Sequence, residues 1–236
     1  MSMISRSAAL AAALLLAAGP ASAAEKRYGL TSFETIELQA DVIVEVTTRA
    51  PVSAVASGPQ DALDRLTVEA RDGRLVIGQR QRAGDERRRA APGPVVVRVN
   101  AANLRGATVA GAGSLRIDRL RGPRVDIGLR GPGRIAVDAV AADRLSVAMI
   151  GNGAITLAGS AKEAKMMLSG AGAVDAGALS VGELVSDSEG AGDHLLRAEK
   201  SATVTTRGVG KTVVLGKPVC TVRNAGSGTV ECGAGK

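Results

Sequence analysis

A pair of glycines separated by one residue recurs seven times in the second half of the chain and limits what that half can fold into. The first members of the pairs are 20, 20, 19, 20, 18 and 18 residues apart. Such a period is typical of one small unit stacked many times, because a single unit cannot bury its apolar face alone. The pairs are Gly111/Gly113, Gly131/Gly133, Gly151/Gly153, Gly170/Gly172, Gly190/Gly192, Gly208/Gly210 and Gly226/Gly228.

Apolar and polar residues alternate on both sides of each pair. At the second pair, Ile127 and Leu129 precede the glycines at alternate positions, and Ile135 and Val137 follow them. This alternation predicts short strands with one buried face. Glycines between two strands suit tight corners with unusual backbone dihedrals, where neighbouring turns approach closely. We therefore predict an all-β fold, a single-stranded right-handed parallel β-helix of about seven short coils over residues 101–236, with the glycine pairs as structural corners.

Residues 24–100 alternate in the same way but lack the period. Asp72-Gly73 between two alternating runs is a hairpin signal. We interpret this region as an irregular β cap on the N-terminal end of the solenoid, so that residues 25–236 form a single body. At the other end, the apolar columns beside the glycine pairs turn polar from Ser188 onward, which predicts weaker apolar packing in the last coils.

Residues 1–23 have the features of a signal peptide: Arg6, an apolar run of Ala and Leu, and small residues at 21–23. No later stretch is long and apolar enough for a membrane helix. We therefore expect an exported protein, periplasmic, secreted or at the cell surface, with no transmembrane segment after signal cleavage. In that oxidising setting Cys220 and Cys232 predict one disulfide, the alternative being two buried thiols.

Three features of the chain together resemble a known family: the signal peptide, the motifs between residues 33 and 77, and the glycine corners. Over about residues 30–232 the chain resembles the putative auto-transporter adhesin head GIN domain family, a bacterial domain of unknown function. The resemblance implies a single-stranded right-handed β-helix and export, and it brings no established catalytic residues. The motifs that carry it are Phe33-x-x-Ile36-x-Leu38, Val42-x-Val44-x-Val46, the Gly-Ala-Gly or Gly-Ser-Gly corners, and Asp72-Gly73-Arg74-Leu75-x-Ile77.

Arginine is concentrated in the first coils. Between residues 98 and 134 there are eight arginines, opposed only by Asp118 and Asp126, in a chain of formal net charge +7. Arginine binds phosphate and carboxylate groups with two parallel hydrogen bonds, so one hypothesis is a surface for an anionic ligand. The alternative is a plain solvated face. The candidate ligand-binding residues are Arg116, Arg119, Arg121, Arg124, Arg130 and Arg134.

Two aspartates raise an enzymatic alternative. Asp118 and Asp138 occupy the same place in successive coils, so their carboxylates could lie about 5 Å apart, like the aligned acids of β-helix polysaccharide lyases. The other interpretation is a turn aspartate paired with arginine. His194 is the one histidine, and we expect it to be a core or cap residue hydrogen-bonded to neighbours such as Ser186 or Ser188.

Other ligand classes find little support. The segment from Arg207 to Thr212 approximates a phosphate-binding loop, but its glycines belong to the repeat and a strand pattern follows where that loop needs a helix. Tyr28 and Phe33 are the two aromatic residues, too few for a stacking surface, which with export argues against nucleic acid. We predict no metal and no cofactor.

These observations predict an exported, non-enzymatic β-helix module, adhesin-like or otherwise an interaction protein of the cell envelope. The ligand is open, with an anionic envelope glycan or another protein as the partners considered. The alternatives are a binder of acidic polysaccharide or lipopolysaccharide through the arginine-rich face, and a polysaccharide lyase-like enzyme.

Overall fold

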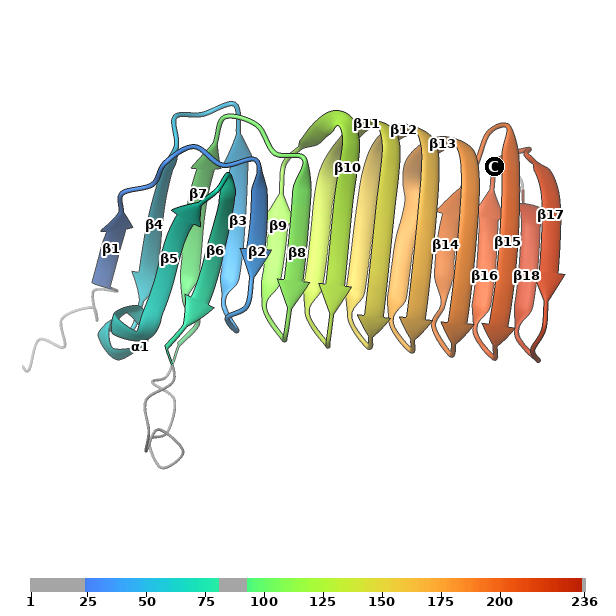
Figure 1. Ribbon diagram of the computed structural model, residues 1–236. Helices are drawn as coiled ribbons and strands as arrows, with labels where there is room; N and C mark the ends of the chain where they lie inside the picture. The colour runs from blue at the N-terminus through green and yellow to red at the C-terminus, as the bar shows by residue number, and fades with distance from the viewer. Residues whose placement is uncertain (1–23, 81–92, 235–236) are drawn as a thin grey trace, which may run out of the picture.

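A computed structural model describes residues 24–80 and 93–234 and shows a parallel β-helix, which confirms the predicted fold class. The strands stack side by side along one axis, from the N-terminal end to the C-terminal end (Figure 1). The predicted signal peptide, residues 1–23, lies outside the described residues.

The repeat region winds as a coil with two faces. The upstream face holds the strand segments before each glycine pair, and the downstream face holds those after it. Because neighbouring turns pair in parallel, equivalent residues stack in columns, as Leu129, Met149 and Leu168 do. The strands are β8 (Gly106–Ala110), β9 (Ser114–Ile117), β10 (Leu120–Arg130), β11 (Arg134–Gly151), β12 (Ala154–Gly170), β13 (Ala173–Gly190), β14 (His194–Arg197), β15 (Ser201–Gly208), β16 (Lys211–Leu215), β17 (Val219–Asn224) and β18 (Thr229–Ala234).

The glycine pairs lie at the corners between the two faces, but the two glycines of a pair are not equivalent. The first glycine has positive φ in the first five pairs, as at Gly151 with φ +120°, a conformation that side-chain-bearing residues rarely adopt. In the last two pairs the first glycines, Gly208 and Gly226, have no positive φ. The unusual dihedral therefore belongs to one glycine per corner and is lost toward the C-terminus.

The expectation of unusual backbone dihedrals is wrong for the second glycine of every pair. None of these seven described residues has positive φ: Gly113, Gly133, Gly153, Gly172, Gly192, Gly210 and Gly228. Their role is steric, because a Cβ at each would collide with the neighbouring turn. A Cβ built on Gly153 would lie 2.5 Å from the carbonyl oxygen of Gly133, and one on Gly172 would lie 2.6 Å from that of Gly153.

The same close approach continues at both ends of the series. A Cβ on Gly192 would meet the carbonyl oxygen of Gly172, and one on Gly228 would meet that of Gly210. Gly113 has no earlier glycine pair beside it, and its Cβ would instead meet the carbonyl oxygen of Ala40 in the N-terminal region. At all seven second glycines the neighbouring backbone thus leaves no room for a Cβ, and the same is true of first glycines such as Gly170 and Gly190.

The opposite corner absorbs the differences in repeat length. In β11, β12 and β13 the strand runs around this corner without a break, so the corner is a bend in a continuous strand. Bulges lie here, between Val137 and Val140 and between Thr156 and Ala158. Before this corner, β13 pairs with residues 20 positions later in the chain, as Val174 does with His194. After the corner the separation is 18, as between Glu183 and Ser201.

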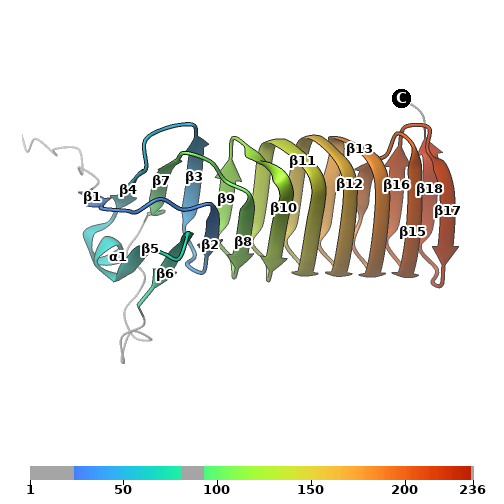
Figure 2. The ribbon, with the colours of Figure 1, turned by 45° about the horizontal axis from the view of Figure 1, so that its top comes forward.

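The N-terminal region joins the same sheet, but not in chain order. The turn formed by β2 and β3 lies between the turn of β6 and β7 and that of β8 and β9. Strands β4 and β5 then pair antiparallel with β7 and β6, and β1 pairs antiparallel with β4 (Figure 2). The elements are β1 (Ala24–Tyr28), β2 (Thr35–Leu38), β3 (Ile43–Thr48), β4 (Ser53–Gly58), α1 (Gln60–Arg65), β5 (Leu66–Arg71), β6 (Arg74–Gln79) and β7 (Val96–Ala101).

The β5–β6 hairpin turns at the predicted Asp72-Gly73. Both residues have positive φ, 51° and 72°, the pattern of the tight turn whose twist matches that of the flanking strands. Strand pairing runs up to Arg71 and Arg74 on either side, so the turn fixes the register of the hairpin.

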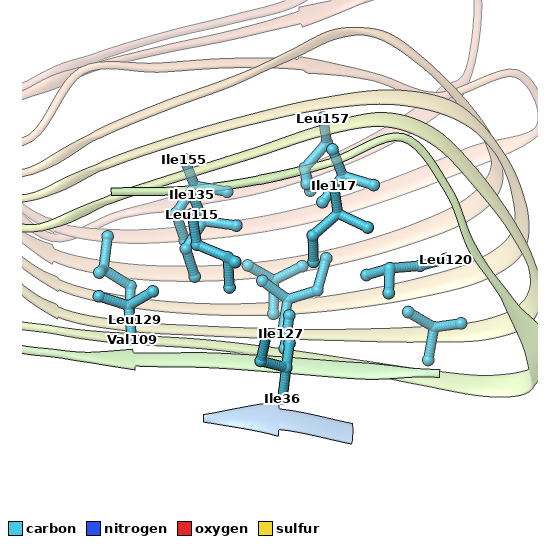
Figure 3. Packing of buried hydrophobic residues seen from close by; sticks show 14 of the residues in the cluster. Ile36, Val109, Leu115, Ile117, Leu120, Ile127, Leu129, Ile135, Ile155 and Leu157 are labelled. Carbon is cyan, nitrogen blue, oxygen red and sulfur yellow. The ribbon is translucent and has the colours of Figure 1, made fainter. Parts of the chain in front are cut away.

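The core is a set of apolar columns inside the coil. Leu115, Ile135 and Ile155 stack in one column of the downstream face, and Ile117 lies near Leu157 in the next (Figure 3). All five side chains are buried. The columns become polar toward the C-terminus, where the buried side chains include those of Ser186, Ser188, His194, Thr206 and Thr212.

Candidate functional site: an arginine belt

The six candidate arginines all belong to one turn and its edges, and they surround it rather than covering one face. Arg116 on β9 and Arg134 at the start of β11 point outward from the downstream face. Arg124 and Arg130 on β10 point outward from the upstream face, while Arg119 and Arg121 lie at the corner between the faces. We call these six residues the arginine belt.

The belt differs from neighbouring arginines in its lack of carboxylate partners. Arg98, Arg105 and Arg144 each form a salt bridge with a glutamate. Within the belt, Arg116 is paired, through contacts as short as 3.1 Å with Asp138. For the other five, Arg119, Arg121, Arg124, Arg130 and Arg134, no salt bridge is formed with any carboxylate in residues 24–80 and 93–234. Their charges are thus available to a ligand.

The two aspartates considered for catalysis make structural contacts. Asp118 accepts hydrogen bonds from the backbone N–H of Thr48, at 2.9 Å, and from its hydroxyl, at 3.2 Å. Asp138 accepts three hydrogen bonds from the Arg116 guanidinium. Asp118 therefore joins the first turns of the solenoid, and Asp138 neutralises a belt arginine, in line with the turn-aspartate interpretation.

His194 is buried in the C-terminal interior, as predicted for a core residue, but the expected hydrogen bonds are not formed. Its Nδ1 and the Ser186 hydroxyl each lack a hydrogen-bond partner in the described part of the chain. The two side chains point inward from opposite faces of the coil. Burial lowers the pKa of His194, and the nearby Asp193 carboxylate opposes that shift. At pH 7 the imidazole is therefore mainly neutral.

The segment that approximates a phosphate-binding loop is a solenoid corner. Gly208 and Gly210 stack on the preceding glycine pair, and strand β16 begins directly at Lys211. The Lys211 N–H donates to Asp193, and its ammonium forms a 2.7 Å salt bridge with Glu231. Among the described residues, no group of three or more His, Cys, Asp or Glu side chains is placed to hold a metal ion.

Cys220 and Cys232 form the predicted disulfide. Cys220 continues the inward column of Ala202, and Cys232 continues that of Val214. The bond therefore joins the two faces of the last turn. A disulfide is typical of proteins that fold outside the cytoplasm. In the two described stretches of the chain, no helix has the length and apolar character needed to cross a membrane.

Known structures share this architecture. A putative adhesin from Bacteroides fragilis superposes with a TM-score of 0.79 at 21% identity, over 90% of this chain and 98% of that one. A putative lipid binding protein from Parabacteroides distasonis gives 0.71 at 16%, over 91% and 98%. A putative adhesin from Parabacteroides merdae gives 0.67 at 18%, over 91% and 97%. At these identities the likeness concerns the fold.

The fold and the corner motifs define a parallel β-helix with glycine corners. Residues 32–218 match the family described as "Putative auto-transporter adhesin, head GIN domain", and the chain belongs to that family. The search of functionally curated proteins gives no match.

One charge pattern in the repeats is absent from the sequence predictions. Seven residues before the first glycine, the second to fifth pairs have Arg124, Arg144, Glu163 and Glu183. Extending the aligned columns outward from the glycine pairs would have found this change of sign.

Proposed function

We propose that the protein is an exported, non-enzymatic adhesin-like module that acts in the periplasm or at the cell surface and binds an anionic envelope glycan through the arginine belt. The observation that carries the proposal is the set of five belt arginines without carboxylate partners in the described structure. Family membership supports an interaction role.

The chemistry of the belt suits phosphate or carboxylate groups on a polymer. A guanidinium offers paired N–H donors that match either group, and arginines on two faces and a corner can follow a chain that wraps around the solenoid. Sugar-ring stacking contributes little, because Phe33 is buried and Tyr28 is half-buried on β1, at the N-terminal end of the molecule.

The test is binding of the exported protein to lipopolysaccharide and to a polyuronate, with neutral dextran as the reference polymer. We expect binding to both anionic polymers, and we expect the affinity to fall steeply between 50 and 500 mM salt. Salt screens the attraction between exposed charges, and the screening length is about 10 Å at 0.1 M. Arg119→Gln with Arg121→Gln should reduce the affinity on the order of tenfold.

The matched control is Arg71→Gln with Arg74→Gln, which removes the same charge from the β5–β6 hairpin. If the control pair weakens binding as much as the corner pair, net charge rather than the belt is responsible. Salt-independent binding, or none, contradicts the proposal.

A further inference from the structure

The upstream face of β10–β13 exposes large apolar side chains near its centre. Ile150, Met167 and Val185 are 58%, 54% and 47% exposed. Ala148 is exposed beside them, paired in register with Met167. Charged residues surround this cluster. Apolar side chains gathered on one exposed face and rimmed by charge are typical of a protein-contact surface.

The surrounding charges change sign halfway along these four strands. Near the bend, the outward column reads Arg124, Arg144, Glu163 and Glu183 from β10 to β13, and these four residues line an open groove of about 570 Å³. Near the glycine corner, the outward column begins with Arg130 on β10 and reaches Glu189 on β13. The β10 half of the face is thus basic at both edges, and the β13 half is acidic.

We propose that this face binds a second copy of the chain in a two-fold dimer whose solenoid axes are antiparallel. Such a dimer has a two-fold axis that is parallel to the strands and passes between β11 and β12. Each outward column then faces the same column of the second copy, with the order of the strands reversed. Arg124 then faces Glu183 of the second copy, Arg144 faces Glu163, and Arg130 faces Glu189. Each pair occurs twice, since a two-fold interface is self-complementary.

The uncharged positions fit the same arrangement. Ala148 lies opposite Met167 of the second copy, and Ile150 lies opposite Ser169. Asp126 faces Val185. In these columns, therefore, no two like charges stand directly opposite one another. Parallel axes would instead set Arg124 against Arg130 and Glu183 against Glu189, which like-charge repulsion disfavours. The charge pattern therefore selects the antiparallel arrangement.

The available area is sufficient for a stable dimer. The upstream face continues through β8 and β2 on one side and through β15 and β17 on the other. Eight strands about 4.8 Å apart and seven residues long give roughly 800 Å², which matches the area that each partner of a standard interface buries. At its ends Glu37 on β2 lies opposite Arg223 on β17 of the second copy.

The dimer and the glycan proposal share Arg124 and Arg130, which the dimer would cover. A glycan bound to the dimer would therefore contact Arg119, Arg121 and Arg134, at the corner and on the downstream face. The Arg119 and Arg121 variants therefore test the glycan, whereas the variants below test the dimer.

The experiment is sedimentation equilibrium of three forms of the exported protein: wild type, Glu183→Arg and Arg124→Glu. We expect the wild type to be a dimer. Each variant sets two like-charge pairs across the two-fold axis, which should raise the dimer Kd on the order of 100-fold. In a mixture of the two variants, both charge pairs are complementary again. The mixture should therefore form a heterodimer although neither variant dimerises alone.

The control is Glu69→Arg, which makes the same charge change on β5, two strands beyond β2 and outside the eight strands of the proposed interface, and should remain dimeric. Circular dichroism of each variant checks that the β-helix is folded. A monomeric wild type overturns the proposal. A Glu183→Arg dimer as tight as the wild type does so too, because the copies would then meet elsewhere, such as at the last turn. Failure of the two variants to form a heterodimer also contradicts it.

Discussion

The two ends of the solenoid are finished in different ways. At the N-terminal end, β5 and β4 cover the outer edges of β6 and β7, and the interior is closed by Leu75, Ile77 and Val97, which are fully buried. At the C-terminal end, no strand within the described residues pairs with the outer edges of β17 and β18 (Figure 1). Cys220 and Val222 in the last turn are exposed.

The difference shows two solutions to one problem. A stacked coil must leave an unpaired edge and an uncovered core where it stops. The N-terminal end covers both with antiparallel strands. The C-terminal end instead has a mainly polar interior over the last turns and a disulfide across the final one. There a covalent link takes the place of apolar burial.

The largest expected effect comes from a cavity in the covered end. Leu75→Ala removes a fully buried side chain from β6 and should lower the free energy of unfolding by about 3 kcal/mol. The matched change at the other end is Val230→Ala on β18, where the side chain is half-buried, and it should cost about 1 kcal/mol. Urea unfolding of both variants measures the contrast. Equal losses would mean that the two ends are equally well packed.

Removal of the disulfide should have the next largest effect. Cys220→Ser with Cys232→Ser opens a loop closed by cysteines 12 residues apart. The free energy of unfolding should fall by about 3 kcal/mol, because the disulfide restricts the unfolded chain. We expect the loss to be local, with proteolysis beginning in residues 216–234. Cleavage that begins instead in β4–β7 would show that the disulfide does not protect the open end.

The smallest effect is a pH dependence at the polar end. Burial lowers the pKa of His194 in the folded protein. Below about pH 6.5 this imidazole is therefore protonated more readily in the unfolded chain than in the folded one. Stability should therefore fall as the pH drops from 7.5 to 5.5. His194→Val restores the apolar column, should add about 1 kcal/mol at pH 5.5 and should flatten this dependence.

Thr212→Val is the control for His194→Val, because Thr212 is the register neighbour of His194 and is also buried and polar. It should leave the slope with pH unchanged. Urea midpoints of the three proteins across this pH range measure the effect. A wild type whose stability is constant over the range contradicts the assignment of a buried neutral imidazole.

The sequence predicted the parts of the fold that depend on local geometry. Gly153 stands where a Cβ would collide with the turn below, and Asp72-Gly73 stands at a turn that needs two positive φ angles. The pairing of Cys220 with Cys232 was predicted from two cysteines in a chain expected to be exported, and the disulfide is present. The repeat alone could not separate the two glycines of a corner, because positive φ and close approach select the same residue type.

The parts that depend on which strands become neighbours could not be predicted in this way. Alternation shows that β2 and β3 are strands, but it does not place them between β6–β7 and β8–β9. The repeat puts Ser186 and His194 in the interior, but it does not show that they lie on opposite faces of the coil. The belt was predicted as a list of arginines, whereas its wrapping around one turn required the strand register.

Hydrogen exchange of the native protein, followed segment by segment, tests the contrast between the ends most directly, because it reports local opening. The contrast between the ends predicts that the amides of β17 and β18 exchange first and that those of β6 and β7 are among the slowest. Removal of the disulfide should extend the fast exchange into β15 and β16. Equal protection of the two ends, or faster exchange in β6 and β7, would contradict it.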